Sequence, residues 1–275
     1  ERNLKFWHGK TGDLREARVN ALKPESRNLY RAIEFGLRFP ETRQFSAELL
    51  VRVHVFIELT GRLDDWVTLH ERATRLIEPS PLLMQLLNYC GFYCQRNSQL
   101  VAAIDYHQRS VEIAQQSTHT LRLKEAYFYL ASDYFFEGEY VLAAHYLQQA
   151  RHIIVTSETE EETQYRDAAF ANLEGNIALA LGHYENALDH LHDALGLWNI
   201  EKDTASYVRT MQNIGIAYSR MGDQRRAKQS YAIALGYRDG LHAVDEARLL
   251  VNFGVAYYHD KIYAEALDFY RQAAQ

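Results

Sequence analysis

The chain has 275 residues, 47% of them hydrophobic, and a formal net charge of −6, so its length alone would allow two globular domains. An acidic chain without a basic stripe lacks the electrostatic footprint of a nucleic-acid-binding protein. It also contains no run of eighteen apolar residues that would predict a membrane span, and no signal-peptide pattern. Only four Pro and fourteen Gly interrupt an almost continuous helical periodicity, which predicts an all-α protein.

The first part of the chain does not share the pattern of the rest. Pro24 suits the first turn of a helix, and Leu29, Ile33 and Leu37 follow at helical spacing. We therefore expect a helical lead-in over residues 1–45, followed by a repeat region over residues 46–275 with about six helical hairpins.

An internal repeat dominates the rest of the sequence. A small residue on one predicted helix is followed twelve positions later by Ala on the next helix. The pairs are Cys90/Ala102, Ala131/Ala143, Gly175/Ala187, Gly215/Ala227 and Gly254/Ala266. A small residue lets two helices approach closely, so each pair predicts one tightly packed hairpin. Stacked hairpins of this kind form a solenoid, and the function of a solenoid is usually to bind a partner.

Glycines mark the predicted turns. Gly138, Gly182 and Gly222 each fall five residues before the Ala of a pair, where the first helix must stop in a left-handed conformation. The spacing from one Ala to the next is 41, 44, 40 and 39 residues, counted between positions 102, 143, 187, 227 and 266. The longest step carries the acidic run 157–163, which we expect to open a helix. The other interpretation of this run is a docking patch for a basic partner.

The clearest copies are Asn213-Ile214-Gly215-Ile216-Ala217-Tyr218 with Ala227 and Tyr231, and Asn252-Phe253-Gly254-Val255-Ala256-Tyr257 with Ala266 and Tyr270. A faint copy includes Ile57, Gly61, Trp66 and Ala73. The pattern resembles the tetratricopeptide repeat (TPR), in its long-helix subclass. The resemblance implies a right-handed superhelical solenoid in which the first helix of each hairpin lines a concave face.

A second resemblance concerns residues 25–37. Glu25, Asn28, Leu29, Arg31, Ala32 and Ile33 are similar to the helix that precedes the C-terminal TPR sensor of STAND-type signalling NTPases. This resemblance implies that an inducer binds the TPR array and relieves inhibition of an attached NTPase. The same helix could equally be a plain N-terminal cap. Since no polar terminal helix follows the last repeat, we interpret the chain as a fragment of a larger protein.

Chemical motifs are sparse. Gly9-Lys10-Thr11 superficially matches a P-loop, but Leu4 occupies the position that requires Gly. The histidines, including His183, His190 and His192, lack a metal-binding spacing. We therefore predict no catalytic residue, no metal and no cofactor. Cys90 and Cys94, four apart on one helix, are interpreted as packed thiols in a reducing, cytoplasmic setting.

The candidate binding residues are polar side chains on the first helices of the hairpins. They are Asn88, Asn172, Asn176, Arg209, Asn213, Arg220, Arg248, Asn252 and His259. An amide both donates and accepts, so it can grip a peptide backbone, and Arg favours a carboxylate or phosphate. The alternatives are that these side chains are solvated, or that the Asn residues brace neighbouring helices. Phe135 and Phe136 are candidates for a groove surface or for filling the gap between hairpins.

Two functions stay open at this point. One is a sensor or interaction domain of a larger regulator that binds a protein, a peptide or a small-molecule effector, without nucleic-acid or membrane contact. The other is a constitutive scaffold that assembles proteins and responds to no effector. The sequence does not reveal the ligand, the oligomeric state or the regulated output.

Overall fold

The computed structural model describes residues 23–54, 56–57, 63–117, 119–155, 159–238, 241 and 243–275, and every regular element among them is helical. The predicted all-α fold is confirmed. The chain divides into two compact units, Glu1–Val155 and Thr156–Gln275, which are described separately below.

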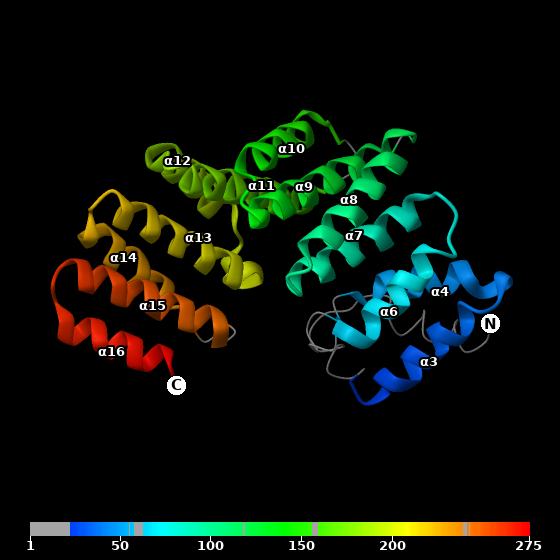
Figure 1. The fold of residues 1–275 in the computed structure, drawn as a ribbon, viewed down its shortest axis with the longest axis horizontal. Coiled ribbons are helices and arrows are strands. Elements are labelled where there is room, and N and C mark those ends of the chain that lie inside the picture. The colour runs from blue at the N-terminus through cyan, green and yellow to red at the C-terminus, as the bar shows by residue number, and fades with distance from the viewer. Residues whose placement is uncertain are drawn as a thin grey trace. The chain divides into compact units, whose positions relative to one another are not determined.

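The first unit is a series of helices in chain order (Figure 1). A short 3-10 turn, η1 (Lys23–Glu25), precedes α3 (Ser26–Gly36), α4 (Pro40–Arg52), α6 (Leu63–Thr74), α7 (Pro81–Arg96), α8 (Leu100–Gln115), α9 (Thr120–Glu137) and α10 (Tyr140–His152). Helices α7/α8 and α9/α10 form antiparallel hairpins, and α9 packs on α8.

The second unit consists of three hairpins. They are α11 (Glu160–Ala180) with α12 (Tyr184–Leu197), α13 (Ile200–Arg220) with α14 (Gln224–Leu235), and α15 (Ala243–His259) with α16 (Tyr263–Ala273). Each first helix packs on the second helix of the hairpin before it within this unit. One apolar core runs through the unit, from Leu188 and Leu191 to Phe253 and Ala256.

The N-terminal helices follow the sequence pattern closely. Leu29, Ile33 and Leu37 are fully buried, as their spacing predicts, and join a core that also contains Trp66. Residue 45, where the sequence predicts the lead-in to end, lies inside α4. The P-loop-like Gly9-Lys10-Thr11 and Gly61 of the faint repeat copy lie outside the described residues.

Close helix approach explains the small residues of the repeat. A Cβ atom added at Gly215 would lie 2.4 Å from Cε1 of Tyr231, and one at Gly254 would lie 2.5 Å from Cε1 of Tyr270. At Gly175 it would lie 2.6 Å from Cγ of Leu191. In all three hairpins the contacting side chain comes sixteen positions after the glycine, so a large side chain packs directly against bare backbone.

The turns repeat with the same regularity. Gly138, Gly182 and Gly222 have φ of 90°, 82° and 86°, which confirms the left-handed helix ends predicted for them. Two further residues with positive φ, Ser98 and Lys261, have φ of 59° and 62°. All five residues precede a buried Ala by five positions, so every hairpin reverses the chain in the same way.

This regularity corrects the register predicted for α7 and α8. The residue five positions after Ser98 is Ala103, which is fully buried, whereas Ala102 is half-buried. The matching small residue is therefore Gly91, whose added Cβ would lie 2.4 Å from Nε2 of His107. The predicted pair Cys90/Ala102 is off by one residue, because His107 replaces the Leu or Tyr that stands sixteen positions after the glycine in the hairpins of the second unit.

Helix α11 differs from α9 and α13 on the face that packs on the preceding hairpin in those two helices. On α9 and α13, the positions eight, four and one before the small residue and three after it are large and apolar. They are Leu123, Tyr127, Leu130 and Tyr134 on α9, and Tyr207, Met211, Ile214 and Tyr218 on α13. On α11 they are Asp167, Ala171, Glu174 and Ala178. The second unit therefore begins with a helix that lacks this apolar row.

Candidate ligand-binding surface

The predicted amides of the second unit meet in pairs between consecutive first helices. Nδ2 of Asn213 on α13 donates to Oδ1 of Asn176 on α11 at 2.6 Å, and both side chains are half-buried. This bond uses one donor and one acceptor, so an N–H of Asn176 and the carbonyl oxygen of Asn213 retain hydrogen-bonding capacity. The pair braces two helices and also offers a donor and an acceptor side by side.

Asn172 belongs to a second contact between the same helices. Its Oδ1 accepts a hydrogen bond from Oγ1 of Thr210 at 2.9 Å. Thr210 is fully buried and accepts in turn from Nε1 of Trp198, also at 2.9 Å. Thr210 and Trp198 were missed in the sequence. The signal that could have found them is the 38-residue offset from Asn172 to Thr210, which is close to the repeat length.

The predicted basic residues lie on the exposed parts of α13 and α15. Arg209 and Arg248 occupy equivalent positions, six residues before Gly215 and Gly254, and both are exposed. Arg209 Nη2 donates to Oγ of Ser206 at 3.4 Å, and Arg248 Nη1 lies 3.7 Å from Oδ1 of Asp245. These long contacts leave both guanidinium groups with donors for an anion.

The remaining predicted residues have mixed surroundings. Asn252 on α15 is half-buried and occupies the position equivalent to Asn213. Arg220 and His259 are exposed at the ends of α13 and α15. Asn88 in the first unit is buried, and its Oδ1 has no hydrogen-bond partner among the described residues. The register correction explains the burial, because Asn88 lies three positions before Gly91 rather than two, as Asn172 does before Gly175, and Asn172 contacts the first helix of the next hairpin.

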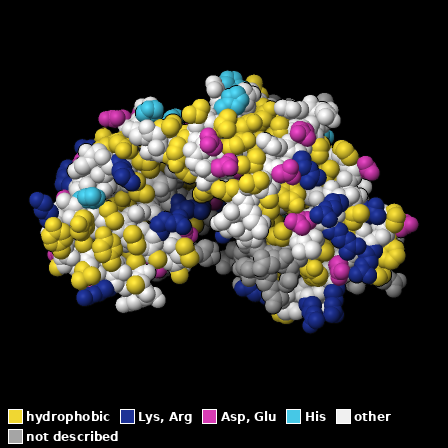
Figure 2. Space-filling view, in the orientation of Figure 1, with side chains coloured by type: hydrophobic (Ala, Val, Ile, Leu, Met, Phe, Trp, Pro, Cys, Tyr) yellow, Lys and Arg dark blue, Asp and Glu magenta, His cyan; other side chains and the backbone are white. Residues whose placement is uncertain are grey.

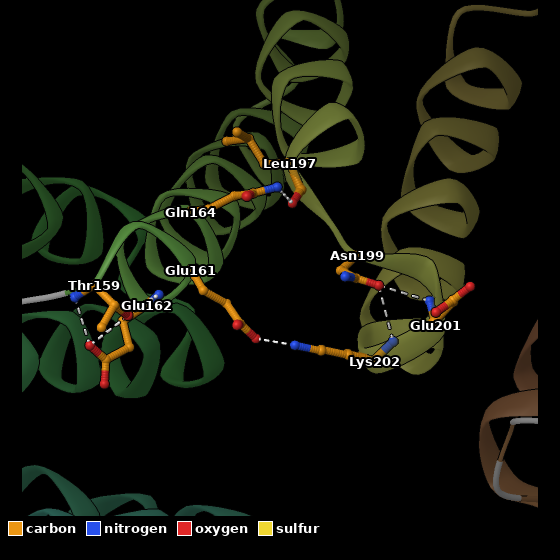
Figure 3. A network of polar contacts seen from close by, with 8 residues as sticks. All are labelled: Thr159, Glu161, Glu162, Gln164, Leu197, Asn199, Glu201 and Lys202. Atoms are coloured by element: carbon orange, nitrogen blue, oxygen red, sulfur yellow. Dashed lines mark hydrogen bonds and ion pairs between the residues drawn. The ribbon is translucent and has the colours of Figure 1, made fainter.

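The start of α11 carries a polar network that links it to α13 (Figure 3). Thr159 and Glu162 form a capping box, in which Thr159 Oγ1 accepts from the Glu162 N–H at 3.2 Å and Glu162 Oε2 accepts from the Thr159 N–H at 2.9 Å. The hydrogen bonds that the Thr159 N–H and the Thr159 hydroxyl donate to the carboxylate lower the pKa of Glu162. Glu161 pairs with Lys202 on α13. The predicted helix start in the acidic run is confirmed at Glu160; positions 157 and 158 lie outside the described residues.

A buried polar cluster holds α7, α8 and α9 together in the first unit. His107 Nδ1 lies 2.5 Å from Oδ2 of Asp133, and its Nε2 lies 3.1 Å from the main-chain oxygen of Asn88. These two contacts, one to each ring nitrogen, hold the imidazole ring in a fixed position between α7 and α9. Gln95 Nε2 donates to Oδ1 of Asp133 at 2.6 Å, and the ring of Tyr129 stacks on His107.

Two other histidines of this unit are held neutral. Burial, and to a smaller extent the charge of His70, lowers the pKa of His54 from 6.5 to about 3. Burial lowers the pKa of His70 to about 4, against the opposing effect of its hydrogen bond with the Trp66 carbonyl. His54 Nδ1 contacts the Tyr93 hydroxyl at 2.9 Å and its ring stacks on Tyr89.

The described residues contain no group of three or more His, Cys, Asp or Glu side chains that could hold a metal ion. Cys90 and Cys94 are buried and unbonded to each other, and burial raises the pKa of the Cys94 thiol to about 11. Both thiols are therefore protonated packing groups, as predicted.

Phe135 is half-buried against Tyr140, while Phe136 is exposed. No described helix is both long and apolar enough to cross a bilayer.

Residues 167–238 match the model of the tetratricopeptide repeat family. No curated protein matches the chain. Among solved structures, a Rap protein complexed with Competence and Sporulation Factor is similar with a TM-score of 0.70 and 16% identity, over 98% of this chain and 74% of that one.

Two other structures share the fold. The Cut9 and Hcn1 hetero-tetramer of the APC/C gives a TM-score of 0.67 and 17% identity, over 93% of this chain and 45% of that one. BtubC (BKLC) from P. vanneervenii gives a TM-score of 0.60 and 21% identity, over 77% of this chain and 89% of that one.

Repeated antiparallel hairpins with glycine contacts define a helical-repeat protein, a class whose typical role is to bind other proteins. More particularly, the segment that matches the tetratricopeptide repeat model runs from within α11 to just after α14, and the described helices share the fold of the Rap protein structure.

Proposed function

We propose that the first helices of the second unit bind an extended peptide or protein segment. The observation that carries this proposal is the contact between Asn176 and Asn213, which places an available donor beside an available acceptor on α11 and α13, the first helices of two consecutive hairpins. A peptide backbone presents the same alternation of N–H and C=O groups. Asn252, at the equivalent position of α15, would extend the row by one further helix.

The flanking arginines suggest the chemistry of the bound segment. Arg209 and Arg248 are exposed at equivalent positions, and a carboxylate can accept two parallel hydrogen bonds from a guanidinium group. We infer that the preferred segment carries an acidic side chain or a free C-terminus near these residues. Arg220 and His259 are candidates for additional rim contacts.

Selection from a random peptide library against the immobilised chain tests the proposal. Selected peptides should bind with at least about 10-fold lower affinity to the double variant Asn213→Ala/Asn252→Ala, since hot-spot truncations cost about 2 kcal/mol or more. Asn186→Ala is the matched control, because Asn186 is an exposed amide on the second helix α12. If both variants weaken binding equally, or if neither does, the assignment of the surface is refuted.

We further propose that binding at this surface regulates a larger protein in the cytoplasm, as the resemblance of residues 25–37 to the helix before STAND sensors suggests. The Rap protein with bound Competence and Sporulation Factor supports an effector-binding role by analogy of fold. A constitutive scaffold is the second candidate. A Walker motif and a winged helix encoded upstream of Glu1 would support the regulator, and an upstream reading frame without them would remove it.

A further inference from the structure

An arginine and an asparagine repeat in the same arrangement on two neighbouring first helices of the second unit. Arg209 and Asn213 lie about one helical turn apart on α13, and Arg248 and Asn252 lie about one turn apart on α15. Helices α13 and α15 pack against each other, so the two pairs are neighbours on one surface. In Figure 2, dark blue Lys and Arg side chains lie over α13.

Both guanidinium groups are open to an acidic ligand. The side chain of Arg248 is 58% exposed, and its contact with Asp245 at 3.7 Å is longer than a hydrogen bond. Arg209 is exposed and contacts the hydroxyl of Ser206, which carries no charge. Within the part of the chain that the structure describes, neither arginine has a carboxylate at hydrogen-bonding distance.

The amide of Asn252 is also available. Ile216 on α13 occupies the position that Asn176 occupies on α11, and an aliphatic side chain cannot bond to an amide. Asn252 therefore has no counterpart of the hydrogen bond between Asn213 and Asn176, and its side chain bonds to no other described residue. It keeps two donors and one acceptor for a peptide backbone.

The distance between the helices selects the conformation of the ligand. The axes of packed helices lie about 8–10 Å apart, so equivalent side chains on α13 and α15 are separated by about the same distance. A polyproline II segment has three residues per turn and rises about 3.1 Å per residue, so residues i and i+3 point the same way and lie about 9 Å apart. In a β-strand, residues that point the same way lie about 7 Å or about 13 Å apart, which fits the helices less well.

We propose that the preferred ligand is a polyproline II segment with acidic side chains at positions i and i+3, one bound by Arg209 and the other by Arg248. This inference rests on the proposed function, because it uses the same surface. Asn213 and Asn252 bond to the ligand backbone at residues that are also three apart. A polyproline II backbone makes no internal hydrogen bonds, so its N–H and C=O groups are free for these amides. Helix α11 has Ala169 at the position equivalent to Arg209, so one acidic pair is sufficient.

Fluorescence anisotropy of labelled peptides with the full chain tests the proposal. The peptides carry two Glu residues in a neutral background, at spacings i and i+2, i and i+3, or i and i+4, so they all have the same net charge. The peptide with the i and i+3 spacing should bind about 10-fold more tightly or better, since each of the others loses a charge-assisted hydrogen bond. With this spacing, Pro-Pro between the two Glu residues should give tighter binding than Gly-Gly, because proline favours the polyproline II conformation.

Charge reversal identifies the two arginines as the contacts. Arg209→Glu should prefer a peptide in which Lys replaces one Glu, and Arg248→Glu should prefer the peptide in which Lys replaces the other Glu. Arg225→Glu is the matched control, because Arg225 is exposed on the second helix α14 and should not alter the preference. Circular dichroism establishes that each variant is folded.

Three results would overturn the inference. They are equal affinity for the three spacings, tighter binding of the Gly-Gly peptide, and charge-reversal variants that prefer the same peptide as the wild type. Library peptides that bind through Asn213 and Asn252 but lack an acidic pair would overturn this inference and leave the proposed function intact. If no peptide binds the chain, both proposals fail.

Discussion

The substitution Gly91→Ala is the sharpest test of the α7/α8 register. The new Cβ would lie 2.4 Å from Nε2 and 2.5 Å from Cε1 of His107, about 1 Å closer than an ordinary carbon contact. The ring cannot retreat freely, because Asp133 and the Asn88 carbonyl hold its two nitrogens at 2.5 and 3.1 Å. Either the helices must separate or the hydrogen bond between His107 and Asp133 must break.

Both routes are costly. Overpacking a core usually costs about 1–3 kcal/mol, and leaving a buried polar group without its hydrogen-bond partner costs about 1–3 kcal/mol. We expect Gly91→Ala to lower the free energy of unfolding by about 3 kcal/mol. In contrast, Cys90→Ala only removes a buried sulfur and should cost about 1 kcal/mol. Gly196→Ala is the control, since an added Cβ there meets nothing within 4 Å and Ala favours a helix.

Urea unfolding followed by circular dichroism measures these differences. A double-mutant cycle identifies their cause, because Gly91→Ala should cost little once His107→Ala has removed the ring. The register assignment is wrong if Gly91→Ala costs no more than Cys90→Ala. It is also wrong if His107→Ala leaves the cost of Gly91→Ala unchanged.

Three further predictions concern stability. The pKa values of His54 and His70 are lowered to about 3 and about 4 in the folded chain, so the unfolded chain binds protons first as the pH falls below 6.5. Each of these two histidines should therefore remove about 2 kcal/mol of stability by pH 5. The His70→Phe variant should lose less stability between pH 7 and pH 5 when its unfolding is measured by urea titration. Lys261→Gly should raise the melting temperature, because glycine removes about 1 kcal/mol of strain from the left-handed backbone conformation. Gly222→Ala should lower the melting temperature for the same reason. Changes of the same sign in the two variants would contradict the turn geometry. Thr159→Ala should cost about 1 kcal/mol through loss of the α11 cap, and an unchanged midpoint would argue against that cap.

The hairpins of the second unit could be predicted from the sequence because five of its glycines have one of two structural uses, close helix contact or the end of a helix. Gly175, Gly215 and Gly254 contact a large side chain on the partner helix, and Gly182 and Gly222 end helices. In each case the spacing and the residue type point to the same geometry, so the fold class followed directly.

The sequence specified the register of α7 and α8 less clearly than that of the hairpins in the second unit. Cys90 and Gly91 are both small, Ala102 and Ala103 are adjacent, and the turn residue is Ser98 rather than Gly. The polar His107 also occupies the position that carries Leu or Tyr in the hairpins of the second unit, so the repeat pattern is harder to recognise there. Its burial depends on Asp133, which is 26 residues away and becomes a partner only once α9 packs on α8.

The candidate site was predictable only in part. Repeat spacing placed Asn213 and Asn252 at equivalent positions, but it did not reveal that Asn176 would accept a hydrogen bond from Asn213. That contact depends on the distance between two helices from different hairpins.

The positive-φ turns constrain where this chain tolerates insertions and deletions. From Ser98 to Lys261 the left-handed residue always precedes the buried Ala by the same number of positions. Removing one residue there would rotate the second helix by about 100° and turn its Ala away from the contact. Length variation should therefore be confined to the loops between hairpins, where segments such as 153–159 already differ in length from their counterparts.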